Sequence, residues 1–292
     1  MSKPYNCIGL VGIPRQSSAL ETHRTLYHWL IEHNYQVLVE DTLISQLKAD
    51  INHYASLNEI GKKADLAIII GGDGNMLRSI RYLAHHNIKM IGINRGNLGF
   101  LTDISPDDAI EKISQVLAGK YIEDSRFLLE VDIYRDNELI ESGFAVNEIV
   151  IHPSKVAHMI AFDAYINEQS AFSQRADGLI IASPTGSTAY SLSAGGPILM
   201  PQLEAFIITP MFPHSLSARP IVINSDNTIR LKFPTSQQDL ALSCDSQVII
   251  PVRSKDELVI KKAPNAFHLI HPADYNYFRN LSTKLGWSQK LF

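Results

Sequence analysis

The chain of 292 residues has little cysteine, no long apolar run and no large net charge. Its two cysteines, Cys7 and Cys244, lie far apart, which argues against a disulfide framework and favours reduced, buried thiols. The eleven histidines form no His-Glu-x-x-His pattern, and no paired cysteine motif predicts a zinc site. No run approaches the about 18 apolar residues of a membrane helix, and the first residues form no signal-peptide core. A net charge of −4 gives no basic field for nucleic acid. We therefore expect a cytoplasmic protein with no membrane or nucleic-acid partner and no built-in metal.

Two familiar nucleotide-binding motifs are absent as well. Gly-x-x-x-x-Gly-Lys-Ser/Thr does not occur, so the chain is not a P-loop enzyme. No Gly-x-Gly-x-x-Gly follows the first apolar run, so the common dinucleotide-binding fold is not supported.

What the chain does contain is a different glycine-rich loop, made of Gly71, Gly72, Asp73, Gly74 and Asn75. An apolar run precedes it and apolar residues at helical spacing follow it, which predicts a buried strand, a turn and a helix start. Glycines let the backbone approach a phosphate, and a helix N-terminus presents free N–H groups to it. A carboxylate there would repel phosphate, unless Asp73 binds a metal ion or takes a proton from a hydroxyl nucleophile. The alternative is that Asp-Gly simply forms a tight turn.

The first 125 residues alternate between strand and helix patterns. We predict helices from a capping box at Ser18 to about Glu32, and from Ser105-Pro106 to near Gly119. The predicted strands are residues 7–12, 35–40, 66–70 and 88–93. This alternation predicts an α/β domain whose parallel sheet is covered on both faces, with ligands at the carboxyl ends of the strands. Both the glycine loop and the segment after residue 93 lie at such ends.

Residues 126–270 have a different texture, with short β-rich runs separated by turns and almost no helical pattern. The runs are residues 128–134, 144–151, 159–166, 179–182, 228–233, 247–251 and 258–261. They predict an all-β, sandwich-like C-terminal domain. The tail, residues 271–292, includes Trp287 and Phe292 and is too apolar to be free, so we expect it to pack back on the N-terminal domain.

Polar residues interrupt the β-rich region at two places. Residues 183–197 are rich in Ser, Thr and Gly and could present hydroxyl and N–H groups to a base or a phosphate, or form an ordinary flexible loop. Within that segment Tyr190 could stack on a base or be a core tyrosine. Asn147 and Glu148 lie inside a β run, where polar groups are costly unless paired. They suit the two hydroxyls of a ribose, or they could face solvent.

Three further residues are ambiguous when taken alone. Arg175 and Asp177 have a surface ion pair as their default interpretation. Arg95, in the segment Asn94-Arg95-Gly96-Asn97, could hold phosphate or belong to a simple turn.

Taken together, these motifs resemble those of the bacterial NAD kinases, in the family's order and over nearly the whole chain. The motifs are Gly71-Gly72-Asp73-Gly74-Asn75, Asn94-Arg95-Gly96-Asn97-Leu98-Gly99-Phe100-Leu101, Asn147-Glu148, and Asp177-Gly178 with Thr185-Gly186-Ser187-Thr188-Ala189-Tyr190. Diacylglycerol, sphingosine and phosphofructo-kinases share the glycine-aspartate motif, whereas the segment from Thr185 to Tyr190 is more specific.

The resemblance implies transfer of the γ-phosphoryl group of ATP, with Mg²⁺ or another divalent cation, to the adenosine 2′-hydroxyl of NAD, giving NADP. It makes Asp73 the catalytic residue, and the phosphate or ATP loop Gly71, Gly72, Gly74 and Asn75. The NAD-binding positions it implies are Asp73, Gly74, Asn147, Glu148, His158, Arg175, Asp177, Thr185, Thr188, Ala189, Tyr190, Ser191, Leu192, Ser193 and Gln247. It also implies a homodimer or homotetramer with the acceptor site near a subunit boundary.

The chain departs from the family pattern at two positions, and rival functions remain open. Ser246 stands where many members have glycine, which weakens the assignment of Gln247, and His158 stands where some members have a longer basic side chain. One rival is a lipid kinase of the diacylglycerol type, which would use the same glycine loop. The other is a non-catalytic NAD-sensing protein, against which the intact Asp73 argues.

Overall fold

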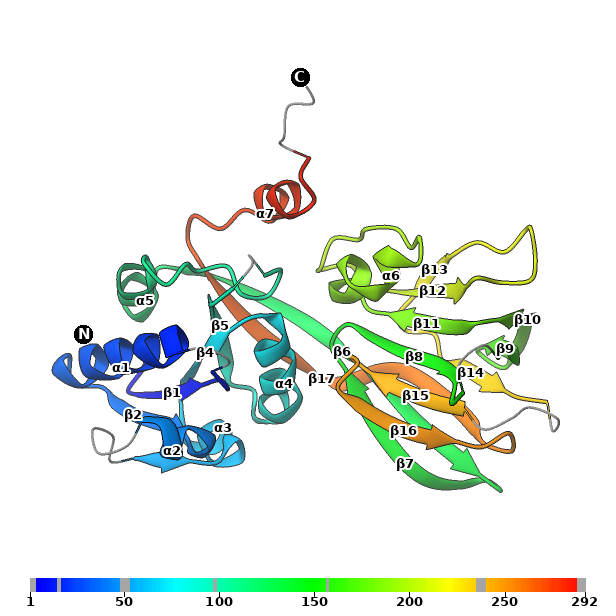
Figure 1. The fold of residues 1–292 in the computed structure, drawn as a ribbon, viewed down its shortest axis with the longest axis horizontal. Coiled ribbons are helices and arrows are strands. Elements are labelled where there is room, and N and C mark those ends of the chain that lie inside the picture. The colour runs from blue at the N-terminus through cyan, green and yellow to red at the C-terminus, as the bar shows by residue number, and fades with distance from the viewer. Residues whose placement is uncertain are drawn as a thin grey trace. The chain divides into compact units, whose positions relative to one another are not determined.

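The computed structural model describes residues 4–14, 17–47, 53–96, 99–155, 158–234 and 240–287. The chain divides into two compact units (Figure 1). The N-terminal unit comprises Met1–Ser125 together with Phe267–Phe292, and the β unit comprises Arg126–Ala266. Two long strands, β6 (Tyr121–Arg135) and β17 (Glu257–Pro272), have residues in both units.

The N-terminal unit contains the predicted parallel sheet, with strand order β3-β2-β1-β4-β5. Its strands are β1 (Cys7–Val11), β2 (Gln36–Glu40), β3 (Tyr54–Ala55), β4 (Leu66–Gly71) and β5 (Lys89–Asn94). Each pairs in parallel with its neighbour, and the end of β17 adds a parallel partner to β5. The sequence pattern missed β3, because its two residues are too few to show a periodicity.

Helices cover both faces of this sheet, as the strand pattern requires. They are α1 (Ser17–Glu32), α2 (Ile44–Leu47), α3 (Leu57–Lys63), α4 (Asp73–Leu83) and α5 (Ala109–Leu117), and a further helix, α7 (Tyr277–Lys284), follows β17. Leu10 and Ile91 face a core shared with α1 and α5. Gly9 and Gly92 alternate to the other face, where an added Cβ would meet Ile60 of α3 and Met76 of α4.

One predicted helix boundary is wrong. The helix expected from Ser105 begins at Ala109, and the Ser105 hydroxyl accepts a hydrogen bond from the Asp108 N–H just before it. The predicted start of α1 rests on the side chain of Ser18, which lies outside the described side chains.

The β unit is all-β, as predicted for the C-terminal domain, and its strands pair antiparallel. One sheet has the order β13-β12-β11-β8-β15-β16, and a second contains β10, β9, β14 and β17, with β6 and β7. The strands not yet given are β7 (Glu138–Ala145), β8 (Glu148–Pro153), β9 (Ile160–Ile166), β10 (Gln169–Ala176), β11 (Gly178–Ala182), β12 (Ala205–Met211), β13 (Ile221–Asn224), β14 (Ile229–Lys232), β15 (Leu240–Cys244) and β16 (Val248–Val252). Side chains from both sheets form one apolar core, which includes Phe162, Phe206 and Leu242. This is the packing of a sandwich.

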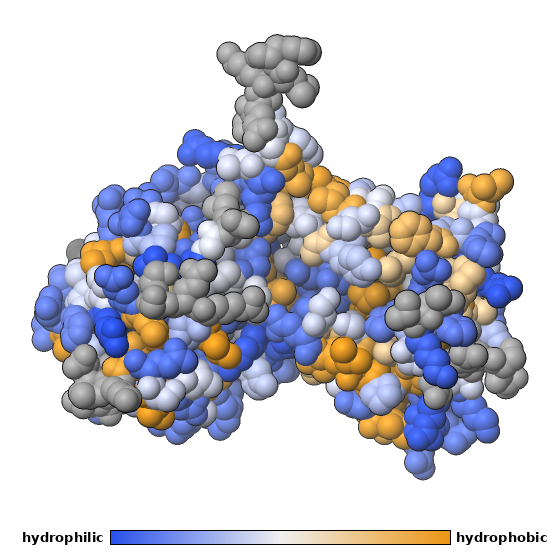
Figure 2. Space-filling view, viewed as in Figure 1, coloured by the Kyte–Doolittle hydropathy of each residue, from blue (hydrophilic) through white to orange (hydrophobic). Residues whose placement is uncertain are grey.

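The surface in Figure 2 mixes hydrophilic and hydrophobic residues. Exposed large apolar side chains on the β unit include Phe212, Leu216 and Ile249. None of the helices in the described ranges is long and apolar enough to cross a membrane. Both cysteines are free and buried, as the sequence predicted.

Candidate functional site

The glycine loop joins β4 to α4, so it lies at the carboxyl end of a buried parallel strand. Gly71 ends the strand with φ +151°, and an added Cβ would lie 2.1 Å from the Asn75 Nδ2 atom. Gly71 is therefore required by the backbone. Gly72, the N-cap of α4, has φ −94° and open space where a Cβ would stand. Gly72 leaves room beside the helix N-terminus.

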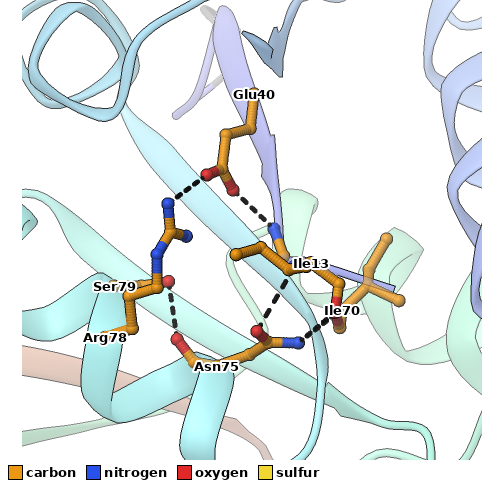
Figure 3. A network of polar contacts seen from close by, with 7 residues as sticks. Ile13, Glu40, Ile70, Asn75, Arg78 and Ser79 are labelled. Atoms are coloured by element: carbon orange, nitrogen blue, oxygen red, sulfur yellow. Dashed lines mark hydrogen bonds and ion pairs between the residues drawn. The ribbon is translucent and has the colours of Figure 1, made fainter. Parts of the chain in front are cut away.

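A polar network fixes the end of β1 beside this loop (Figure 3). The Asn75 amide donates to the Ile13 carbonyl and accepts from the Ile13 N–H, at 3.0 and 3.3 Å. The buried Glu40 carboxylate accepts from the Gly12 N–H at 2.9 Å and from Arg78 at 2.6 Å. The side chain of Asn75 is thus occupied in holding the loop together, a role that the sequence did not predict.

These elements enclose a pocket in the N-terminal unit. It is lined by Ile13, Pro14, Ala19, Gly71, Gly72, Gly74, Asn75 and Arg95. The Arg95 guanidinium is held by Thr22, to whose Oγ1 the Nε atom donates at 2.6 Å. The N-terminus of α4 and a fixed guanidinium in one pocket make a site for an anion such as a phosphate.

Asp73 is the first residue of α4, and the loop after β5 holds its carboxylate. Oδ2 accepts from the Phe100 N–H at 2.8 Å, and Oδ1 accepts from the Leu101 N–H at 3.1 Å and from the Thr102 hydroxyl at 3.2 Å. The side chain remains 30% exposed. Asp73 is therefore more than a turn residue, because its carboxylate is oriented by three donors and still reaches the surface.

A lysine that the sequence analysis did not identify lies beside Asp73. The Lys284 Nζ atom, from the last residue of α7, is 3.8 Å from Asp73 Oδ2 and 4.0 Å from the centre of the Phe100 ring. Burial lowers the pKa of Lys284, and the charge of Asp73 partly offsets this. About 200 residues separate the two side chains in the chain, so no local motif could have revealed the pair.

In the β unit, Asn147 and Glu148 are held through their backbone by a second acid, Asp245. The Asp245 carboxylate accepts from the backbone N–H groups of Val146, Asn147 and Glu148, at 2.9, 2.7 and 3.2 Å. The side chain of Asn147 is half-buried, and Glu148 is only 4% exposed. The alternative of a solvent-facing pair is therefore wrong for Glu148.

Glu148 is an acid in an unusual environment. Burial, reinforced by the charge of Asp245 and opposed by the Tyr190 N–H, raises the pKa of Glu148 to about 8. Its Oε2 atom is buried without a hydrogen-bond partner in the described part of the chain. A buried acceptor of this kind suits a ligand hydroxyl.

The Ser/Thr/Gly segment has defined secondary structure and packs closely against Asn147, in contrast to the flexible-loop alternative. It forms a 3₁₀ turn, Thr185–Thr188, followed by α6 (Tyr190–Ser193). The Ser183 hydroxyl donates to the Val146 carbonyl at 2.6 Å and accepts from the Gly186 N–H at 3.2 Å. An added Cβ at Gly186 would lie 2.1 Å from the Asn147 carbonyl oxygen. Gly186 is thus required by the close approach of the two motifs.

Side chains of this segment border a second pocket. Tyr190 and Ser193 line it together with Met211 and Arg219. Tyr190 is 41% exposed, so it is not a core tyrosine, and its ring is available for stacking. The remaining predicted residues of the segment differ in burial. Thr185 and Ser191 are buried, and Thr188, Ala189 and Leu192 are half-buried.

The other predicted NAD-binding residues, His158, Arg175, Asp177 and Gln247, have exposed side chains. Backbone hydrogen bonds join Arg175 and Asp177 to the end of β12 and the segment after it. The Arg175 carbonyl accepts from the His214 N–H, and the Asp177 N–H donates to the Met211 carbonyl, both at 2.9 Å. Asn97 and Leu98 of the second motif lie outside the described residues.

The turn before Gln247 has a backbone that suits the glycine expected at position 246. Asp245 and Ser246 have φ +52° and +56° between β15 and β16. Positive φ at both central residues is the geometry of a tight hairpin, and glycine adopts it without strain. Ser246 therefore occupies a position where glycine fits better, while the turn itself is kept.

In the described ranges, no group of three His, Cys, Asp or Glu side chains is placed to hold a metal ion. Both oxygens of Asp73 already accept hydrogen bonds from the loop after β5. These contacts do not form a resident cation site.

Comparisons with known proteins agree over the full chain. Residues 8–121 match the ATP-NAD kinase N-terminal domain, and residues 146–272 match the ATP-NAD kinase C-terminal domain. The NAD kinase of Serratia proteamaculans is 56% identical over 292 residues, covering 100% of both chains. That of Yersinia pestis is 55% identical over 291 residues, covering 100% of this chain and 99% of its own.

Two solved structures share the fold. The yeast NADH kinase complexed with NADH has a TM-score of 0.88 at 23% identity, covering 100% of this chain and 93% of its own. An NAD kinase from Archaeoglobus fulgidus in complex with ATP has a TM-score of 0.73 at 24% identity, covering 96% and 98%.

Proposed function

We propose that this chain, which belongs to the NAD kinase family, transfers the γ-phosphoryl group of ATP to the adenosine 2′-hydroxyl of NAD and so produces NADP. The observation that carries the proposal is the Asp73 carboxylate, oriented by three donors at the N-terminus of α4. It stands next to glycines that line a pocket with Arg95. A base and an anion site side by side are what transfer of a phosphoryl group to an alcohol requires.

In this mechanism the N-terminal unit binds the donor and supplies the base. The phosphates of ATP occupy the pocket of Gly71, Gly72, Gly74 and Asn75, where N–H groups and Arg95 neutralise their charge. Asp73 takes the proton of the 2′-hydroxyl, or holds that hydroxyl as the loose transition state forms. Mg²⁺ bound to the phosphates of ATP supplies further positive charge.

The β unit binds the acceptor. Glu148 and Asn147 hold the adenosine ribose and base, and Tyr190 stacks beside them. Thr185, Thr188, Ala189, Ser191, Leu192 and Ser193 complete the nucleoside pocket, and His158, Arg175, Asp177 and Gln247 border the rest of the dinucleotide. The unpartnered Oε2 atom of Glu148 supports this assignment, because a ribose hydroxyl would satisfy it.

Each of the two rival functions explains fewer of the observed features. A lipid kinase would explain the glycine loop but not the polar segment built around Asn147, and the full-length relatives are named NAD kinases. A non-catalytic NAD sensor would not need a carboxylate held by three donors beside an anion pocket.

We also propose that the chain acts as a homodimer or homotetramer through its β unit. β13 and β16 are the outer strands of the six-stranded sheet, and both expose apolar side chains, including Val222 and Ile249. An unpaired edge with exposed apolar residues favours pairing with a second copy. A cytoplasmic location is proposed from the two free, buried cysteines.

One assay tests the function. The purified chain is incubated with ATP, Mg²⁺ and either NAD or diacylglycerol, and the phosphorylated product is identified. NADP is expected. Phosphatidic acid would identify the lipid kinase, and NAD binding without any product would identify the sensor.

A further inference from the structure

Lys284 takes no part in the mechanism given above, yet it lies against the Asp73 carboxylate. Its Nζ atom is 3.8 Å from Asp73 Oδ2, longer than a hydrogen bond, and stands over the Phe100 ring. The lysine side chain is 21% exposed and the aspartate side chain 30%. A cation that is largely desolvated yet keeps an open side can accept a second anionic partner.

Packing, a helix cap and an ion pair position Lys284. Leu281 of α7 is buried, and the Asn276 side chain caps the helix by accepting from the Arg279 N–H at 2.9 Å. His271 pairs with Asp103 at 3.0 Å, and Asp103 directly follows the loop that holds Asp73. The lysine is thus fixed by the fold.

The chemistry proposed for Asp73 creates a need that this lysine meets. A hydroxyl held by Asp73 must be approached by a phosphoryl group that carries negative charge, and a carboxylate repels it. Arg95 lies in the pocket beside Gly71 and Gly72, whereas Lys284 is the cation in contact with Asp73 itself.

We propose that Lys284 is a further catalytic residue, whose ammonium group contacts the phosphoryl group as it passes to the hydroxyl held by Asp73. The hydroxyl O–H bond breaks and its proton goes to Asp73. A new P–O bond forms to the acceptor oxygen, while the bond to the β-phosphate breaks and ADP leaves with the electron pair. Lys284 keeps its protons and balances charge throughout. This inference rests on the proposed function.

The test compares Lys284→Met, which keeps most of the apolar stem, with Lys284→Arg, which keeps the charge. Removal of one preorganised donor to transition-state charge costs about 10² to 10³ in turnover. We therefore expect kcat of the Met variant to fall about 100-fold, with the KM values for ATP and NAD changed less than about threefold. The kcat of the Arg variant should be at least about tenfold higher than that of the Met variant, because arginine keeps the positive charge.

Lys112→Met is the matched control, because it removes another lysine of the same unit and an ion pair to the segment before α7. Its kcat should equal that of the wild type. Calorimetry adds a readout that seating of the helix alone would not change. The Met variant should bind ADP normally but lose at least about tenfold in affinity for ADP with NAD and aluminium fluoride, a mimic of the transferring phosphoryl group.

A Met variant with kcat within threefold of wild type overturns the proposal. So does an equal loss in Lys112→Met, or unchanged affinity for the mimic, because either result assigns the effect to seating of α7. A wild-type chain that makes no NADP overturns the proposed function instead. The binding measurement with the phosphoryl mimic can still be compared between the wild type and the variants in that case.

Discussion

At the scale of single residues, Asp73 combines two tasks. Its carboxylate accepts hydrogen bonds from Phe100, Leu101 and Thr102, so it holds the loop after β5 as well as being placed for catalysis. A substitution at this residue therefore changes stability and chemistry together.

We expect Asp73→Asn to lose about 10² to 10⁴ in turnover, the contribution of a general base. The amide has one acceptor oxygen in place of two, so the free energy of unfolding should also fall, by about 1 to 3 kcal/mol. Turnover is measured by NADP formation and stability by urea denaturation. Retention of more than about a tenth of the wild-type turnover would show that Asp73 is mainly structural.

Glu148 gives a pH-dependent prediction. Its pKa in the folded chain is about 8, against an ordinary 4.5. Below about pH 4.5 the carboxyl is protonated in both the folded and the unfolded chain, so it does not make the free energy of unfolding depend on pH. As the pH rises towards 8, the unfolded chain loses this proton while the folded chain keeps it, so stability is lost by up to about 1.4 kcal/mol per pH unit.

Glu148→Gln should remove this loss, because the amide does not titrate. Between pH 5 and 8 the wild type should lose stability relative to the variant, as measured by urea denaturation at each pH. At pH 7 the variant should also bind NAD more weakly while binding ATP unchanged. Parallel stability curves would mean that Glu148 is ionised in the folded chain, and equal losses for both ligands would contradict the division of tasks between the units.

At the scale of elements, parallel pairing builds the donor site. Gly71 pairs in register with Asn94, so the two loops that follow β4 and β5 start at the same edge of the sheet. The Arg95 N–H donates to the Gly71 carbonyl at 3.2 Å, and the loop continues to the residues that hold Asp73. The glycine loop is useful because a second loop, about 20 residues later, completes it.

The two glycines at the start of α4 should respond differently to alanine. Gly71→Ala introduces a side chain at φ +151° and against Asn75, so it should lower the unfolding free energy by about 1 to 3 kcal/mol. Gly72→Ala meets open space and should leave stability unchanged, but its methyl group enters the phosphate pocket. We expect its KM for ATP to rise about tenfold, equivalent to about 1.4 kcal/mol. An unchanged KM would mean that the phosphates do not approach Gly72.

At the scale of the whole molecule, the C-terminal segment returns to the N-terminal unit after the β unit is complete. This return brings Lys284 to Asp73. The exposed Asp177, in contrast, lies in the β unit, where a second copy of the chain could use it.

We expect Asp177 to contribute to the site of a neighbouring subunit, while Asp73 acts in its own. Asp73→Asn and Asp177→Ala chains should each be poor enzymes, but co-expressed they should form mixed assemblies whose activity exceeds the sum of the two parents. Light scattering must first show an oligomer, since a monomer removes the premise. Mixed oligomers with only the summed parental activity would place Asp177 in its own subunit, or outside the site.

The sequence by itself determined the class of fold, the positions of the glycine loop and the Thr185–Tyr190 segment along the chain, and the family. Buried strands such as β1 and β4 are continuous apolar runs, and the glycine loop and the Thr185–Tyr190 segment are contiguous, so local patterns reveal them. It did not reveal strands such as β7, because most of that strand is exposed and has no apolar periodicity.

Tertiary structure alone decided which distant side chains meet. Lys284 beside Asp73, Glu40 beside Arg78 and Asp245 beneath Asn147 are each separated by many residues in the chain. The burial that raises the pKa of Glu148 likewise depends on neighbours from other strands. Charge and burial are properties of a residue's surroundings in space, and only the folded chain supplies those surroundings.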